Sequence, residues 1–275
     1  MTSYPGDLYS DIELLKRLAD ESDAISLDRY SAQDLEIETK PDLTPVTDAD
    51  RAVEKKIREI LAEERVSDLV VGEEFGRPTE IEKESRYWVI DPIDGTKNFL
   101  RGVPIWATLI GLVHRDLSGT DRVVAGIVSA PALFRRWYAA SGFGAFTEVN
   151  GGPATQIYVS KVSSLKDASL SFSDLAGWGE RKSGYLEFLE KIWRVRGIGD
   201  FWSHMLVAEG AVDIAAEPVL ALWDMAPLAV ILDEAGGTFT DLEGNPGPFG
   251  ANGVSSNGIL HNEFLKSIST TGGKV

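Results

Sequence analysis

Hydrophobic positions recur along the chain at two spacings, one typical of helices and one of buried strands. A capping box at Ser10 precedes apolar residues three and four apart, which predicts an amphipathic helix to about Leu27. A second helix of this kind opens at Thr47 or Asp48. Short apolar runs bounded by polar turns predict strands at 66–71, 87–90, 107–114, 123–129 and 136–140.

The second half of the chain alternates the two patterns. Strands are expected at 168–173, 194–198, 212–216 and 238–241, and helices at 182–193, 201–209 and 225–234. This order predicts a mixed α/β fold (α+β) with two layered halves, residues 1–150 and 151–275, that form one compact catalytic unit.

Composition narrows the chemistry that the chain can perform. It has 275 residues, no Cys and three His, which excludes disulfides, thiolate zinc sites and Cys nucleophiles. Carboxylates are the abundant hard ligands, and they suit Mg²⁺, Mn²⁺ or Ca²⁺. The net charge of −16 argues against a nucleic-acid or anionic-membrane partner, although bound metal would still allow a phosphorylated substrate.

Targeting signals are not apparent in the sequence. The N-terminus has neither a basic region nor an apolar run, which is unlike a signal peptide. The longest apolar stretch, near Val103 to Val113, is too short to cross a bilayer. A cytoplasmic protein with no membrane partner is the expectation.

The strongest local signal is the segment Trp88 to Thr96, in which an apolar strand ends in two aspartates. Asp91 and Asp94 could share divalent cations, and the amides of Gly95 and Thr96 could cradle a phosphate. The alternative is a polar turn in which both aspartates cap backbone groups.

Three further acidic residues have one structural and one functional interpretation each. Glu73 follows an apolar strand and is either a solvated turn residue or a ligand, because ligands gather beyond the carboxyl ends of strands. Asp224 either caps a helix or brings a third carboxylate from the other half of the chain. Asp50 either completes a capping box with Thr47 or orients an attacking water, and the chemistry leaves both open.

A glycine-rich turn at 196–202 enters another helix. Its small residues leave room for a substrate, and Asp200 could face that space, although a simple strand-to-helix turn fits equally well. His204, on the apolar helix that follows, is interpreted as a core or interface residue rather than a ligand. The chain has no G-x-S-x-G and no P-loop motif, which disfavours serine hydrolases and P-loop kinases.

Taken together, these motifs resemble the inositol monophosphatase family of Mg²⁺-dependent, Li⁺-sensitive phosphatases. WVIDPIDGTKNF at 88–99 is similar to the first family signature, and residues 223–237 to the second. Gly72-Glu73-Glu74 and the segment from Lys40 to Asp50 stand at the corresponding places. The resemblance covers about residues 10 to 260.

The resemblance implies a five-layer α-β-α-β-α sandwich, as in the inositol monophosphatase and fructose-1,6-bisphosphatase type, and a homodimer. It implies two or three Mg²⁺ ions, with Mn²⁺ as a possible substitute, that activate water for attack on a phosphate monoester. The implied metal ligands are Glu73, Asp91, the Ile93 carbonyl, Asp94 and Asp224. The implied catalytic residues are Glu73, Asp50 and Thr96, the last two polarising the water. Gly95 and Thr96 would bind phosphate, Asp224 and Glu217 would contact the substrate, and Lys40 would lie in a loop near the metals.

Within this family the stretch 196–217 is most similar to the histidinol-phosphate phosphatase group. Histidinol phosphate carries an ammonium and an imidazole, whereas inositol carries hydroxyls, so Asp200 and Glu217 would suit the cationic group. Trp202 could pack against the imidazole. The alternatives are that Asp200 only caps its helix and that the substrate is an inositol, sugar or nucleotide phosphate. A non-catalytic protein on this fold is disfavoured, because every expected ligand is present.

Overall fold

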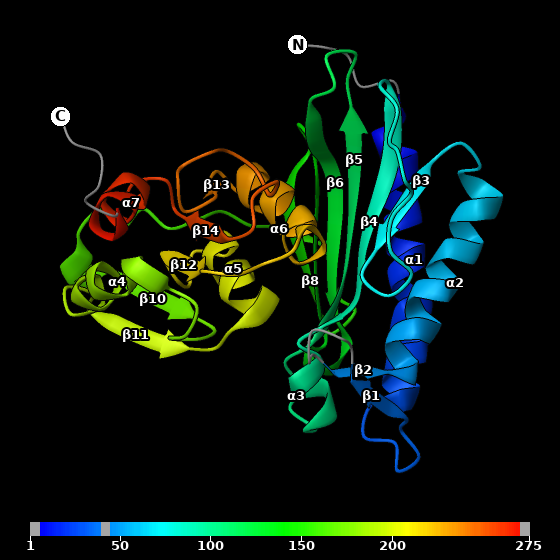
Figure 1. Ribbon diagram of the computed structural model, residues 1–275, viewed down its shortest axis with the longest axis horizontal. Helices are drawn as coiled ribbons and strands as arrows, with labels where there is room; N and C mark the ends of the chain where they lie inside the picture. The colour runs from blue at the N-terminus through cyan, green and yellow to red at the C-terminus, as the bar shows by residue number, and fades with distance from the viewer. Residues whose placement is uncertain (1–5, 40–44, 270–275) are drawn as a thin grey trace.

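The structure, a computed structural model, describes residues 6–39 and 45–269. Five layers follow one another across the molecule (Figure 1): two N-terminal helices, a seven-stranded sheet, two helices, a five-stranded sheet, and two outer helices. This arrangement confirms the expected α-β-α-β-α sandwich.

The first layer consists of α1 (Leu8–Arg29) and α2 (Asp48–Glu64). The predicted capping box at Ser10 is wrong, because Asp7 is the N-cap and accepts a hydrogen bond from the Tyr9 amide at 3.1 Å. Asp11 is instead buried inside α1, where it forms ion pairs with two arginines of neighbouring elements. The predicted capping box at the start of α2 is confirmed, with Thr47 as its N-cap.

The larger sheet has the spatial order of the sequence, β3 to β9. The β3 and β4 strands run parallel and the remaining neighbours antiparallel. A short antiparallel ribbon, β1 (Ile37–Thr39) with β2 (Pro45–Thr47), leads into α2. The seven strands are β3 (Leu69–Gly72), β4 (Ser85–Asp94), β5 (Ala107–Arg115), β6 (Asp121–Ala130), β7 (Arg135–Ala140), β8 (Gly144–Val149) and β9 (Thr155–Gln156).

The smaller sheet has the order β11-β10-β12-β14-β13. Its strands are β10 (Ser169–Phe172), β11 (Arg194–Gly197), β12 (Ile214–Glu217), β13 (Thr238–Thr240) and β14 (Gly253–Ser256). The sequence pattern missed β14, because Gly-Val-Ser-Ser has little strand propensity and its burial between β12 and β13 comes from tertiary pairing.

Four longer helices and one short helix complete the fold. Helices α5 (Asp200–Ala208) and α6 (Leu222–Glu234) form the layer between the sheets, and α4 (Lys182–Leu189) and α7 (His261–Ile268) cover the outer face of the smaller sheet (Figure 1). The short α3 (Thr96–Leu100) follows β4 directly. No helix within the two described ranges is both long and apolar enough to cross a membrane.

Helix α6 lies unusually close to the larger sheet. A Cβ atom at Gly126 of β6 would come within 2.8 Å of the Cα of Pro227, and one at Gly111 of β5 within 3.0 Å of the Ala226 Cβ. These glycines therefore allow the backbone of α6 to pack directly against the strands. The depth of α6 in turn fixes where its first turn, with Asp224, meets the end of β4.

Candidate active site

A cavity of about 490 Å³ lies between the two halves, where strand ends of both sheets meet the first turns of α5 and α6. Of the lining residues that the structure describes, Lys97 is the one lysine or arginine. Seven carboxylates line the same space: Glu73, Asp91, Asp94, Asp174, Asp200, Glu217 and Asp224. The cavity is therefore strongly acidic and suited to cations.

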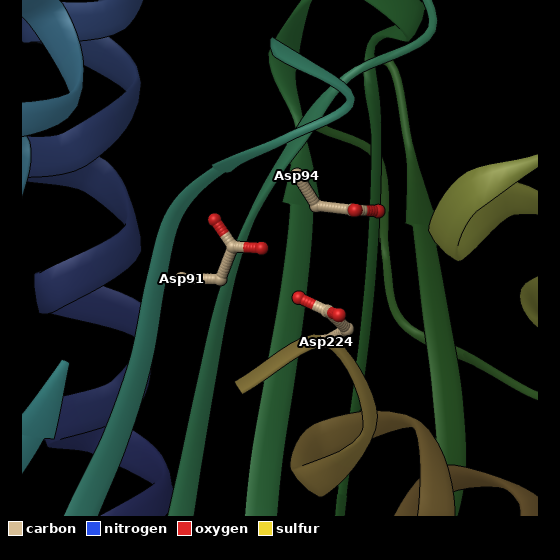
Figure 2. Close-up of side chains that lie close together, drawn as sticks. All are labelled: Asp91, Asp94 and Asp224. Carbon is tan, nitrogen blue, oxygen red and sulfur yellow. The ribbon is translucent and has the colours of Figure 1, made fainter. Parts of the chain in front are cut away.

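Three of the predicted metal ligands form a tight group. One carboxylate oxygen from each of Asp91, Asp94 and Asp224 lies within 4.8 Å of the others. Figure 2 shows the three side chains directed toward a common space, two from the end of β4 and one from the start of α6. The pairing of β4 with β5 shifts register between Asp91 and Asp94, which turns both carboxylates toward this space.

Burial and mutual repulsion make these carboxylates hard to ionise. Burial raises the pKa of Asp91 well above its ordinary value, and the charges of Glu73, Asp94 and Asp224 add to the effect. The pKa of Asp94 is likewise raised well above its ordinary value, first by burial and then by nearby acids that include Asp200. Burial raises the pKa of Asp224 to about 7. A divalent cation among them would remove this repulsion.

Backbone amides orient each aspartate with one hydrogen bond. The Ile93 amide donates to Asp91 Oδ1 at 3.0 Å, and the Phe201 amide donates to Asp94 Oδ2 at 2.7 Å. The Ala221 amide donates to Asp224 Oδ2 at 2.7 Å, which completes the cap of α6. The capping interpretation and the ligand interpretation are compatible, because each bond engages only one carboxylate oxygen.

Glu73 lines the cavity on a turn that Glu54 holds from α2. The buried Glu54 carboxylate accepts hydrogen bonds from the amides of Glu74 at 2.7 Å and Phe75 at 3.3 Å. It also pairs with Arg58 at 2.7 Å. Any side chain at Gly72 would overlap this carboxylate, because a Cβ there would lie 1.9 Å from Glu54 Oε1.

Sequence reasoning overlooked Glu54, although a signal was available. Glu54 stands three and seven residues before the buried Ile57 and Leu61, on the apolar stripe of α2. A carboxylate on such a stripe is rarely buried without a partner, so its position points to a structural or functional task.

Asp50 is buried and does not line the cavity. Its Oδ2 accepts hydrogen bonds from the Thr47 amide at 2.8 Å and the Thr47 hydroxyl at 2.5 Å, so its capping role is present. Burial raises the pKa of Asp50 to about 7, with smaller contributions from the charges of Glu74 and Glu73. Its role toward an attacking water remains a prediction.

The predicted phosphate-binding turn follows the predicted metal ligands. Gly95 has φ of 83° and precedes α3, and a Cβ there would lie 2.9 Å from the Ile105 carbonyl oxygen. The Thr96 hydroxyl donates to the Ile93 carbonyl at 3.0 Å. All three residues Ile93, Gly95 and Thr96 line the cavity, whereas Lys40 lies outside the described residues.

Asp200 faces the cavity from the first turn of α5. Gly199 is the N-cap of this helix and Asp200 makes no side-chain cap, so the helix-cap alternative for Asp200 is wrong. The Asn98 amide nitrogen donates to Asp200 Oδ2 at 2.9 Å and fixes its direction. Burial, followed by the charge of Glu217, raises the pKa of Asp200 to about 6, although Lys97 acts to lower it.

His204 is buried, as expected of a core residue, but it also borders the cavity, whereas Trp202 does not take the place expected of it. Trp202 packs against the apolar core between the sheets and is not among the described residues that line the cavity, whereas His204 is. His204 follows Asp200 by four residues, so the two share one face of α5, and Trp202 points elsewhere. This i, i+4 spacing is the signal that would have identified His204.

Comparisons with known proteins agree over nearly the whole chain. The family model described as "Inositol monophosphatase family" matches residues 8–271. A protein named histidinol-phosphatase from Streptomyces coelicolor is 53% identical over 261 residues, which cover 94% of this chain and 97% of that protein. Another histidinol-phosphatase, from Mycobacterium tuberculosis, is 51% identical over 263 residues, which cover 95% and 98%.

A solved structure gives the same result for the fold. An IMPase from Thermotoga maritima has a TM-score of 0.80 at 28% sequence identity, and the match covers 95% of this chain and 97% of that one. The signatures, the layered fold and these similarities lead to one conclusion: the chain belongs to the inositol monophosphatase family.

Proposed function

We propose that this protein is a divalent-cation-dependent phosphatase that hydrolyses histidinol phosphate to histidinol and phosphate. The observation that carries the proposal is that one cavity holds two groups of carboxylates. The cluster of Asp91, Asp94 and Asp224 suits metal ions, and Asp200 with Glu217 suits an organic cation. The relatives named histidinol-phosphatase support the same substrate.

The donor set fits hard divalent cations. The cluster offers carboxylate oxygens, and burial followed by the charges of neighbouring acids raises the pKa of Asp91 and Asp94. Such oxygens are the preferred ligands of Mg²⁺. We propose two or three Mg²⁺ ions, replaceable by Mn²⁺, on Glu73, Asp91, the Ile93 carbonyl, Asp94 and Asp224. When bound, these ions would supply a hydroxide-like water and offset the charge of the phosphate and the leaving alkoxide.

The residues of the chain would then position and deprotonate the reactants. Gly95 and Thr96 would receive the phosphate at the turn before α3. Asp50, with a pKa of about 7, is suited to take a proton near neutral pH, and together with Thr96 it would polarise the attacking water. Attack by water on phosphorus breaks the ester bond, and the leaving alkoxide takes up a proton.

The organic half of the substrate would meet Asp200 and Glu217. Histidinol contributes an ammonium and an imidazole, which give both carboxylates a cationic partner. Inositol 1-phosphate, the second candidate and the substrate after which the family is named, would leave both carboxylates facing neutral hydroxyls. The proposed contact between Trp202 and the imidazole would require that side chain to turn toward the cavity.

The resemblance to the family also suggests an oligomeric state and a cellular compartment for this protein. We propose a homodimer that acts in the cytoplasm on a small phosphorylated metabolite. The net charge of −16 supports a partner other than nucleic acid.

Replacing Asp94 with Asn tests the metal site. Asparagine retains an oxygen for the Phe201 amide but removes one negative charge from the cluster. We expect Mg²⁺-dependent phosphate release to fall at least about a hundredfold. The melting temperature of the metal-free protein should not decrease, because a repulsive charge is gone. Asp174→Asn, in the same cavity but outside the cluster, is the control, and full activity of Asp94→Asn would end the metal-site interpretation.

Replacing Asp50 with Asn separates capping from catalysis. The amide oxygen can still accept the hydrogen bonds of Thr47, so we expect the melting temperature to change little. Because the variant cannot accept a proton, kcat should fall by roughly 10² or more. Thr47→Ser keeps the capping box and should behave like wild type. A lower melting temperature with kcat retained would mean that Asp50 serves only the helix.

Replacing Asp200 with Asn tests the substrate assignment. Asparagine tolerates the left-handed backbone at this position, φ of 52°, better than alanine does. Loss of the charge should lower kcat/KM for histidinol phosphate about tenfold more than for inositol 1-phosphate. Both values are measured by phosphate release in Mg²⁺. An equal loss on the two substrates would contradict the role of Asp200 in recognising a cation.

A further inference from the structure

Two buried serine–histidine pairs extend from opposite faces of β14. His261 is fully engaged, with Nδ1 2.8 Å from Ser256 Oγ and Nε2 2.9 Å from Thr240 Oγ1. His204 has Nδ1 2.6 Å from Ser255 Oγ, and of the two histidines it is the one that lines the cavity. In both pairs Nδ1 of the histidine contacts a serine hydroxyl. The pairs differ at Nε2, which has a hydrogen-bond partner in His261 but not, among the described residues, in His204.

The second nitrogen of His204 faces Glu217. Its Nε2 lies 3.5 Å from Glu217 Oε1, too far for a good hydrogen bond, and neither atom has a hydrogen-bond partner among the described residues. Both side chains are more than nine-tenths buried, with exposures of 1% and 7%. An unpaired donor and acceptor are costly inside a protein, so this wall of the cavity is built to be completed by a ligand.

The hydroxyl of Ser255 holds the ring of His204 at its Nδ1 atom. In the described part of the chain, His204 is the hydrogen-bond partner of the Ser255 hydroxyl. In the tautomer in which the hydroxyl donates to Nδ1, the neutral ring carries its proton on Nε2. The ring of His204 is therefore held at Nδ1, and its Nε2 faces Glu217 from the opposite side of the ring.

Glu217 in turn is close to the residue expected to meet the substrate. Its charge is the largest contribution, after burial, that raises the pKa of Asp200. The three side chains of Asp200, His204 and Glu217 therefore form one acidic corner of the cavity. A group that carries positive charge and N–H donors is the chemical complement of this corner.

We propose that His204 is a positioning residue for substrate recognition: with its ring held by Ser255, its Nε2 lies beside Glu217 Oε1 and keeps that carboxylate in place to receive the cationic nitrogen group of the substrate. This inference rests on the proposed function. In this role His204 contributes to substrate selectivity separately from the metal cluster and from Asp200.

The test compares His204→Phe with His261→Phe. Phenylalanine keeps a ring of similar shape next to Phe239, 6.0 Å away, but removes both nitrogens. The readout is selectivity, defined as kcat/KM for histidinol phosphate divided by kcat/KM for p-nitrophenyl phosphate, which has no cationic group. His204→Phe should lower this selectivity about tenfold, mainly through KM for histidinol phosphate. His204→Gln, which restores an N–H group, should recover part of the loss.

The matched control separates recognition from folding. His261→Phe removes a buried histidine from the same half of the molecule and should lower the melting temperature while selectivity stays unchanged. If His204→Phe does not fold, Ser255→Ala is tested in its place, with Ser256→Ala as its control, and should lower selectivity severalfold.

Calorimetric binding of L-histidinol gives a readout independent of turnover. We expect this binding to weaken in His204→Phe.

The outcomes distinguish the two levels of the proposal. A wild-type enzyme with no preference for histidinol phosphate over inositol 1-phosphate would overturn the proposed function itself. A wild-type enzyme with that preference, combined with unchanged selectivity in His204→Phe and Ser255→Ala, would overturn only the role of His204. Loss of selectivity in these variants but not in the two controls would support it.

Discussion

Electrostatic repulsion among buried carboxylates is the constraint on which this site depends. The chain ends two parallel strands at one edge of the larger sheet, and glycines of β5 and β6 let α6 approach closely enough to add Asp224. Backbone amides then hold Asp91, Asp94 and Asp224 in place even though their charges repel. The resulting free-energy cost is localised where a divalent cation would relieve it, so the fold itself prepares the proposed metal site.

The carboxylates of the cavity fall into two groups that differ in the residues around them. Those near β4 have backbone amides and one another as partners, whereas the side-chain amide of Asn98 orients Asp200, and Glu217 lies 3.5 Å from His204. The first group is complementary to metal ions, and the second to an organic cation. Glu54 shows how far the support extends, because it fixes the turn that carries Glu73 without entering the cavity.

Local signals allowed much of this to be predicted. The run from Trp88 to Phe99 indicated both aspartates because strand, proline, glycine and carboxylates stand within one short segment. What remained out of reach depends on tertiary packing, because β14 is too short and polar to predict. The spacing of four residues from Asp200 was available for His204, but which face of α5 meets the cavity depends on how the helix packs against the sheets. For Glu54, the apolar stripe of α2 shows that the residue is unusual, but its task is visible only where the turn at Gly72 meets α2.

The most direct test measures the melting temperature against pH, with EDTA and with Mg²⁺. An aspartate in the unfolded chain has a pKa of about 4, whereas burial raises the pKa of Asp50 and of Asp224 in the folded protein to about 7. Such groups bind more protons when folded, so the stability they contribute is present at low pH and lost as pH rises from about 4 to about 7. We therefore predict that the metal-free protein loses stability over this range and that Mg²⁺ stabilises it far more at pH 7.5 than at pH 5. Stabilisation by Mg²⁺ that does not grow with pH would contradict the account.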